Sequence, residues 1–124
     1  MATPKPRKAK TPAQPKNYRS ALEAEYFYQI ADLPQPHPGY KALLPERRHA
    51  IDYAWPEIML AVEIEGGTYN GGAHVRGVGY RNNCEKYNLL AFKGWYMLRF
   101  TTDHVKSGYA YEMTKAYLQM KGLL

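Results

Sequence analysis

The sequence predicts an α/β (α+β) fold, a small mixed β-sheet flanked by helices. Two runs of apolar and β-branched residues, about 47–55 and 58–65, are separated by the turn-forming Trp55-Pro56-Glu57 and are typical of a strand hairpin. An aromatic-rich run at 95–100 predicts a third strand. Three other segments carry apolar residues at helical spacing. The expected order is therefore helix, strand, strand, helix, strand, helix.

The first helix is expected over about residues 20–32. Ser20 and Glu23 have the spacing of a capping box, in which each side chain hydrogen-bonds to the backbone of the other residue. Apolar residues follow at helical spacing at positions 22, 26, 27 and 30. The prolines at 34, 36 and 38 then predict an extended loop.

The expected hairpin carries three carboxylates. Side chains alternate along a strand, so Glu63 and Glu65 share one face while Val62 and Ile64 take the other. One register places Asp52 directly opposite Glu63, with Cβ atoms roughly 4.5–5.5 Å apart. Opposed like charges destabilise a hairpin, so this register predicts a counter-charge, for which a hard divalent cation is a natural candidate. In the alternative, slipped register the acids lie in solvent.

The second half of the chain is expected to form a helix, a strand and a helix. Residues 66–79 are rich in glycine but contain no Gly-Lys-Ser/Thr, which excludes a phosphate-binding P-loop. A helix fits about residues 80–93 and ends at Gly94. In the strand over 95–100, Arg99 lies on the face opposite Leu98 and Phe100, a position suited to an ion pair. The last helix is expected over about 109–121.

Length and charge indicate one domain with a basic tail. The chain has 124 residues, enough for one core. Residues 1–17 hold five basic and no acidic residues, against 12 basic and 11 acidic residues in the remainder. We expect residues 1–17 to be disordered and residues 18–124 to form a single domain. Such a tail contacts polyanions or serves as a solubilising segment.

Composition also bears on the compartment. The single cysteine, Cys84, excludes an internal disulfide and suits a reducing compartment. No apolar run approaches the ~18 residues of a membrane span, so no membrane partner is expected. The basic N-terminus is followed by no apolar stretch, unlike a secretory signal. We therefore expect a cytoplasmic location, in a bacterium or a phage-infected host.

The order of these motifs resembles a known superfamily. A helix bearing Glu23, a strand with Asp52, a strand with Glu63-Ile64-Glu65 and a helix with a lysine are similar to the PD-(D/E)XK nucleases. A longer series resembles the small phage and bacterial endonucleases related to very-short-patch-repair enzymes; it comprises IDYAWP, AVEIEGGT, HVRG, NCEKYN and GWYMLRFT. The resemblance implies a restriction-endonuclease-like core and a metal-dependent DNA endonuclease that leaves a 5′-phosphate and a 3′-hydroxyl. It leaves open whether such an enzyme nicks duplexes or, as a homodimer, resolves Holliday junctions.

The resemblance also implies the roles of several residues. Asp52 and Glu63 would bind Mg²⁺, for which Mn²⁺ substitutes, and the Ile64 carbonyl would complete the protein ligands. Glu65 stands where the superfamily usually has lysine, and would orient the attacking water or hold a second metal. Lys86, in the next helix, would supply the missing cation. Glu23 either only caps its helix or also reaches the metal through water.

Other residues are candidates for contacts with DNA. His74 is expected to contact phosphate or act in acid–base chemistry, the alternative being a surface histidine. Arg76 and the pair Arg47-Arg48 are candidates for phosphate contacts, and Tyr69 and Tyr80 for stacking on unpaired bases. The tail supplies further cations, namely Lys5, Arg7, Lys8 and Lys10.

Two departures from the pattern leave a second function open. Glu65 replaces the usual lysine, and Asn83 stands where close relatives would carry an acid. These departures are compatible with a catalytically inactive nucleic-acid-binding module on a nuclease scaffold.

Overall fold

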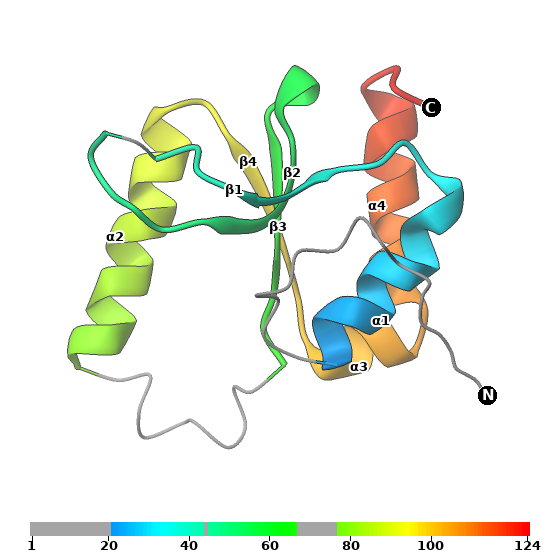
Figure 1. Cartoon of the computed structure of the whole chain (residues 1–124), viewed down its shortest axis with the longest axis horizontal. Coiled ribbons are helices and arrows are strands. Elements are labelled where there is room, and N and C mark those ends of the chain that lie inside the picture. Colours follow the sequence, from blue (N-terminus) through cyan, green and yellow to red (C-terminus); the bar gives the residue numbers. More distant parts are fainter. Residues whose placement is uncertain (1–20, 44, 67–76) are drawn as a thin grey trace.

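The computed structural model describes residues 21–43, 45–66 and 77–124 (Figure 1). The tail and most of the glycine-rich segment lie outside the described residues. The helices are α1 (Ala21–Gln29), α2 (Val78–Phe92), α3 (Thr102–Lys106) and α4 (Tyr109–Met120), with 3₁₀ turns η2 (Ile30–Asp32) and η3 (Pro56–Ile58). The strands are β1 (His37–Tyr40), β2 (Ile51–Trp55), β3 (Leu60–Ile64) and β4 (Tyr96–Phe100).

The strands form one mixed sheet in the order β1-β2-β3-β4. β1 pairs with β2 and β2 with β3 in antiparallel fashion, while β3 and β4 are parallel. Parallel neighbours need a crossover connection, and the segment containing α2 provides it. The predicted class, a mixed sheet flanked by helices, is confirmed.

Helices cover both faces of the sheet. α1, α3 and α4 lie on one side and α2 on the other (Figure 1). On the first side, Val62 and Phe100 pack with Tyr26 of α1 and Leu118 of α4 in the main apolar core. On the second side, Ala61 packs in a smaller cluster with Leu90 of α2. Burial of each large apolar side chain contributes about 1.5–3 kcal/mol, so the two clusters fix both helical layers on the sheet.

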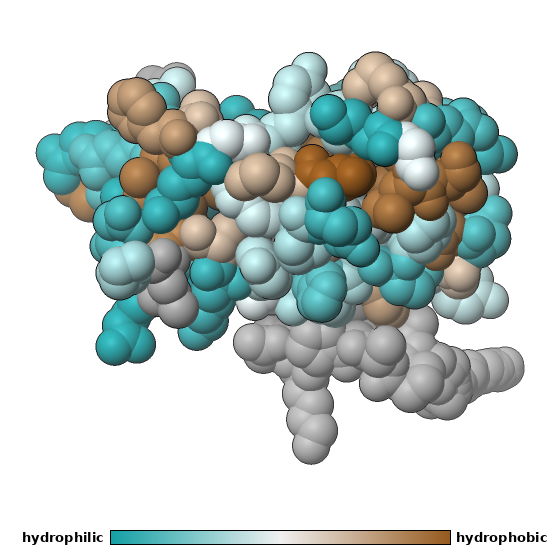
Figure 2. Space-filling view, turned by 90° about the horizontal axis from the view of Figure 1, so that it is seen from above, coloured by the Kyte–Doolittle hydropathy of each residue, from teal (hydrophilic) through white to brown (hydrophobic). Residues whose placement is uncertain are grey.

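Exposed apolar side chains remain at several places. Met59, Tyr96 and Met120 are among the large apolar residues that stay exposed. Figure 2, a view from above, shows hydrophobic and hydrophilic residues intermixed on this face of the molecule. No helix within the described ranges is long and apolar enough to cross a membrane.

The register of the central hairpin is the first of the two alternatives that the sequence left open. Tyr53 pairs with Val62, and Trp55 pairs with Leu60 on the other side of the turn. Continuing this pairing by one residue places Asp52 opposite Glu63, so the alternative slipped register is excluded. The turn is η3, with Pro56 at its first position and Met59 in the left-handed conformation at φ 53°.

Two elements differ from the expectation. Part of the expected extended loop is the strand β1, in which Pro38 pairs with Tyr53. Proline has no N–H to donate to a neighbouring strand. An edge strand such as β1 tolerates this, because only one of its sides is hydrogen-bonded to the sheet. The short helix α3 was not predicted either; Thr101 caps it and forms a capping box with His104. The other helices and strands lie within a few residues of the predicted ranges.

Candidate functional site

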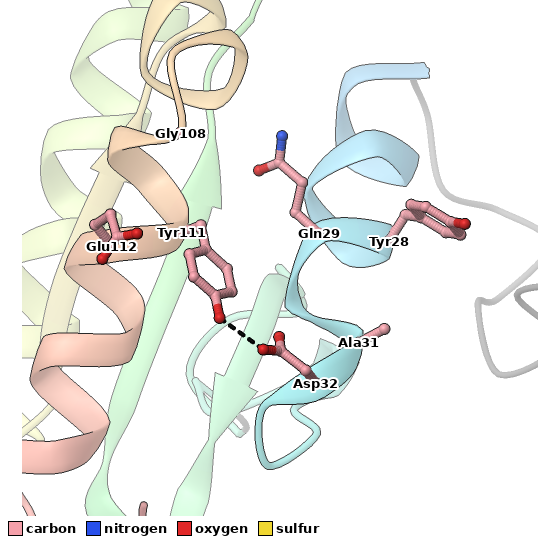
Figure 3. A pocket seen from close by; sticks show the side chains of 7 residues that line it. All are labelled: Tyr28, Gln29, Ala31, Asp32, Gly108, Tyr111 and Glu112. Atoms are coloured by element: carbon pink, nitrogen blue, oxygen red, sulfur yellow. Dashed lines mark hydrogen bonds between the residues drawn. The ribbon is translucent and has the colours of Figure 1, made fainter.

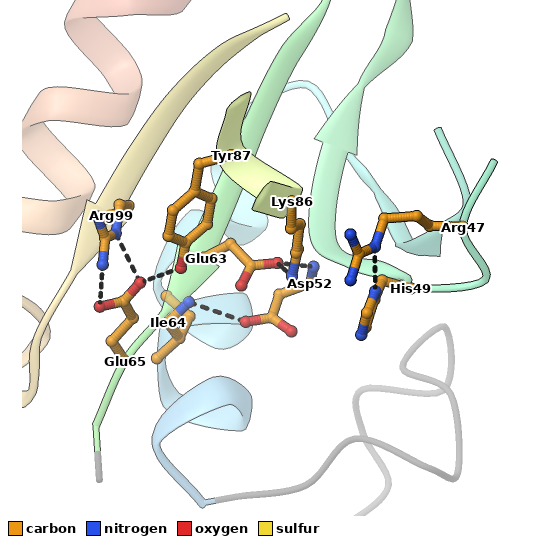
Figure 4. A network of polar contacts seen from close by, with 9 residues as sticks. All are labelled: Arg47, His49, Asp52, Glu63, Ile64, Glu65, Lys86, Tyr87 and Arg99. Atoms are coloured by element: carbon orange, nitrogen blue, oxygen red, sulfur yellow. Dashed lines mark hydrogen bonds and ion pairs between the residues drawn. The ribbon is translucent and has the colours of Figure 1, made fainter. Parts of the chain in front are cut away.

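Three charged side chains form a row across β2, β3 and β4. Asp52 lies opposite Glu63 by the hairpin register, and Glu63 pairs with Arg99 in the parallel ladder. Glu63 and Arg99 alternate with core residues, such as Val62 and Phe100, that face the α1–α4 layer. Their side chains therefore lie on the face covered by α2, near the carboxyl ends of β3 and β4, as the close-up in Figure 4 shows.

Two backbone-to-carboxylate hydrogen bonds hold Asp52 and Glu63 close together. The Ile64 N–H donates to Asp52 Oδ2 at 2.8 Å. The Asp52 N–H donates to Glu63 Oε2 at 3.3 Å. In this arrangement the hairpin places two carboxylates side by side.

The counter-charge expected for this pair is present within the protein. Lys86 on α2 donates from Nζ to Glu63 Oε2 at 2.9 Å, and both residues are buried. Burial raises the pKa of Glu63, the Lys86 charge and hydrogen bond oppose the rise, and the Asp52 charge adds to it. The resemblance implied that Lys86 supplies a cation at this site; the structure places its ammonium beside Glu63, and its catalytic role stays a prediction.

Glu65 has its own partners. Arg99 donates to both of its carboxylate oxygens, from Nε at 2.7 Å and from Nη2 at 3.0 Å, and Tyr87 Oη donates at 2.8 Å. Burial alone would raise the pKa of Glu65, but the hydrogen bonds from Arg99 and Tyr87 outweigh it and hold that pKa below its ordinary value. The ion pair expected for Arg99 is confirmed.

The carboxylates at this site differ from the expected set of metal ligands. Within residues 21–43, 45–66 and 77–124, no three or more His, Cys, Asp or Glu side chains are grouped closely enough to hold a metal ion. The structure therefore does not gather Glu65 or Glu23 with Asp52 and Glu63 into one such group. What it does bring together is a pair of carboxylates beside the Ile64 backbone, whose N–H donates to Asp52 Oδ2. Mg²⁺ commonly binds one or two carboxylates and keeps several waters, so this small set fits Mg²⁺.

Glu23 lies at the start of α1 and is buried. Its backbone carbonyl accepts a hydrogen bond from Tyr53 Oη at 3.0 Å, which ties α1 to the sheet. Ser20, the other half of the expected capping box, is outside the described residues. Both functions considered for Glu23 therefore stay open.

The basic residues before β2 lie near the carboxylates. Arg47 donates to Glu85 Oε1 and to His49 Nδ1, each at 3.4 Å. His49 lies beside Arg47 in the close-up of Figure 4, and partial burial with the charges of Lys86 and Arg47 lowers its pKa. Arg48 is exposed, and so is Tyr80 at the start of α2. Both side chains are therefore accessible to a macromolecule.

The remaining candidates lie outside the described residues. These are His74, Arg76 and Tyr69 in the glycine-rich segment, and Lys5, Arg7, Lys8 and Lys10 in the tail. Their roles stay predictions.

Sequence reasoning missed the contacts of Tyr87 and His49. The Tyr87 hydroxyl donates to Glu65, and its ring lies under the Arg99 guanidinium, whose Cζ is 4.3 Å from the ring centroid. No spacing in the sequence pointed to His49.

A separate hollow of about 560 Å³ lies between α1 and the start of α4 (Figure 3). Tyr111 donates to Asp32 across it at 2.7 Å. The other lining residues are Tyr28, Gln29, Ala31, Gly108 and Glu112. It shares no residue with the carboxylate pair and contains none of the predicted site residues.

Comparison with known proteins gives no relative. No protein-family model, no curated protein and no solved structure matches the chain. The restriction-endonuclease-like core therefore stays a prediction.

Proposed function

We propose that this protein is a Mg²⁺-dependent DNA endonuclease that hydrolyses phosphodiester bonds to a 5′-phosphate and a 3′-hydroxyl. The observation that supports this most is the Asp52–Glu63 pair on adjacent strands, with the Lys86 ammonium 2.9 Å from Glu63. Two carboxylates and a lysine at the carboxyl end of a parallel strand pair are the groups that metal-assisted phosphoryl chemistry uses.

Asp52, Glu63 and the Ile64 carbonyl would hold the metal. When bound there, Mg²⁺ supplies Lewis-acid stabilisation of phosphate charge and a lowered pKa for water. The protein contributes rigidity, because Ile64 N–H holds the Asp52 carboxylate and Lys86 holds that of Glu63. Lys86 also provides donors that stabilise negative charge developing on a phosphate oxygen.

Plasmid relaxation tests the proposal. The wild-type protein is expected to convert supercoiled plasmid to nicked or linear forms with Mg²⁺ or Mn²⁺, and a chelator should stop the reaction. Asp52→Asn and Glu63→Gln should each lower the rate by at least ~10²-fold, the usual scale for loss of one electrostatic stabiliser. DNA binding in a gel-shift assay should persist in both variants.

Glu57→Gln is the matched control, because it removes an exposed carboxylate from the same hairpin. It should cleave at the wild-type rate. Cleavage by Asp52→Asn or Glu63→Gln at the rate of Glu57→Gln would refute the assignment of the site. A panel of linear, mismatched, flap and four-way substrates would then distinguish a nickase from a dimeric junction resolvase.

A second candidate function is a DNA-binding module without catalysis. One observation favours it, namely that Lys86 pairs with Glu63 and Arg99 with Glu65, so both glutamates have a protein counter-charge. The same assay separates the candidates. The binding module would shift DNA in the gel and leave the plasmid supercoiled with either metal.

A further inference from the structure

We propose that Arg99 contacts the phosphate backbone of the DNA substrate at this site, and that Glu65 and Tyr87 are positioning residues that fix its guanidinium. The inference rests on the proposed function, because it identifies the group that receives the phosphate beside the carboxylate pair. It also gives Glu65 a role other than binding metal.

The position of Arg99 is the first argument. Arg99 is the register partner of Glu63 on the neighbouring strand, and neighbouring strands lie about 4.8 Å apart. The row Asp52, Glu63, Arg99 therefore places Arg99 on the strand next to Glu63 and two strands from Asp52, with its guanidinium held on Glu65. A phosphate bridging these positions would present one oxygen to the metal side of the row and another to Arg99.

The second argument is that the guanidinium is held in place. Nε and Nη2 form a two-point contact with the Glu65 carboxylate, and the Tyr87 ring lies 4.3 Å from Arg99 Cζ. Tyr87 in turn donates to the same Glu65 carboxylate. An arginine fixed on three sides loses little side-chain entropy when it binds a ligand.

The third argument is that Arg99 keeps unused donors on an accessible surface. Its side chain is 50% exposed, against 19% for Glu65. Within the described part of the chain its Nη1 carries no hydrogen bond, and the planar fork of arginine suits phosphate oxygens. An exposed ion pair contributes little to stability, so stabilisation of the fold alone accounts poorly for two groups arranged around one side chain.

Salt-dependent binding to a fluorescein-labelled DNA duplex, measured in chelator, tests the phosphate contact without cleavage. Arg99→Ala should reduce the slope of log K against log salt by ~0.9, the loss of one phosphate contact. Arg99→Lys should keep most of the slope, because it keeps the charge. Lys121→Ala is the control, since it also removes an exposed cation near a tyrosine ring but lies just after α4, at the opposite end from the carboxyl end of β3 (Figure 1).

Steady-state cleavage with Mg²⁺ tests the positioning role. Arg99→Ala should lower kcat/KM by about 10²-fold, with partial recovery in Arg99→Lys. Glu65→Gln should bind the duplex more tightly, because it removes a negative charge, and yet show a lower kcat. In the Arg99→Ala background, Glu65→Gln should cause no further loss of kcat, because Glu65 acts through Arg99.

The outcomes distinguish the two proposals. A salt slope and kcat/KM of Arg99→Ala equal to those of Lys121→Ala would overturn the phosphate contact. A further large loss of kcat on adding Glu65→Gln to Arg99→Ala would overturn the positioning role and favour metal binding by Glu65. If the wild type itself fails to cleave, the proposed function fails, while the salt slope of Arg99→Ala still decides whether Arg99 contacts phosphate.

Discussion

Glu63 and Glu65 show how partners determine the chemistry of a side chain. They lie two residues apart, yet burial raises the pKa of Glu63 while Arg99 and Tyr87 lower that of Glu65. A raised pKa means that the folded state binds the proton more tightly than the unfolded state. The contribution of Glu63 to stability is therefore complete below its unfolded pKa and is lost as pH rises through its folded pKa. Glu65 has the opposite sign, and its contribution is lost as pH falls.

Removing Lys86 should make the folded protein sensitive to alkaline pH. Lys86→Met leaves the buried Glu63 carboxylate beside Asp52 without its cation, so the pKa of Glu63 should rise further. Breaking a buried pair in this way costs about 3–5 kcal/mol. We expect a loss of this order in the free energy of unfolding at about pH 8 and a clearly smaller loss at about pH 5, where Glu63 can take up a proton. Urea unfolding at the two pH values measures it.

Two further variants complete this test. The double variant Lys86→Met/Glu63→Gln should recover most of the lost stability at the higher pH, because no buried charge is left without a partner. Lys93→Met, which removes a cation 2.9 Å from the exposed Glu46, should show no comparable pH dependence. An equal loss for Lys86→Met at both pH values would contradict the coupling between Lys86 and Glu63.

At the scale of elements, the β2–β3 hairpin determines the site. A slip of one residue would move Glu63 to the opposite face of the sheet, so its register must be fixed. Apolar side chains on both faces of β3 and the short turn at η3 fix it. The turn has a strained residue, because Met59 adopts φ 53°, a left-handed conformation that favours glycine.

Replacing Met59 with glycine should therefore stabilise the hairpin. The left-handed conformation costs a residue with a side chain roughly 1–2 kcal/mol, and glycine avoids this cost while losing more chain entropy on folding. Met59 is 38% exposed, so only part of its side-chain packing is lost. We expect a net gain of about 0.5–1 kcal/mol, measured by thermal unfolding. Glu57→Gly in the same turn should destabilise, and a loss of stability in Met59→Gly would show that its side-chain contacts outweigh the strain.

At the scale of the molecule, local pattern and long-range pairing contributed differently to what could be predicted. Alternation within β2 and β3 was sufficient to predict the hairpin and to narrow its register to two alternatives, one of which opposes Asp52 to Glu63. β1 was missed because a proline-rich segment becomes a strand only when β2 pairs with it. The α3 helix has five residues, too few for a periodic pattern.

The partners of Glu65 depend on contacts that no local pattern encodes. Arg99 reaches Glu65 because β4 lies parallel to β3 in one register, and Tyr87 reaches it because α2 packs across the same face. The sequence indicated that Arg99 would have an ion-pair partner but did not identify which acid. In consequence, Glu65 was predicted to join the metal ligands, while the structure places it in a network with Arg99 and Tyr87.

Mn²⁺ binding, followed by the loss of the free-ion electron paramagnetic resonance signal, tests the metal site most directly. The wild type and Glu57→Gln should bind Mn²⁺, and excess Mg²⁺ should displace it. Asp52→Asn and Glu63→Gln should each abolish this binding, because each removes one of two carboxylate ligands. Unchanged Mn²⁺ binding in both variants, or none in the wild type, would contradict a metal site at this pair.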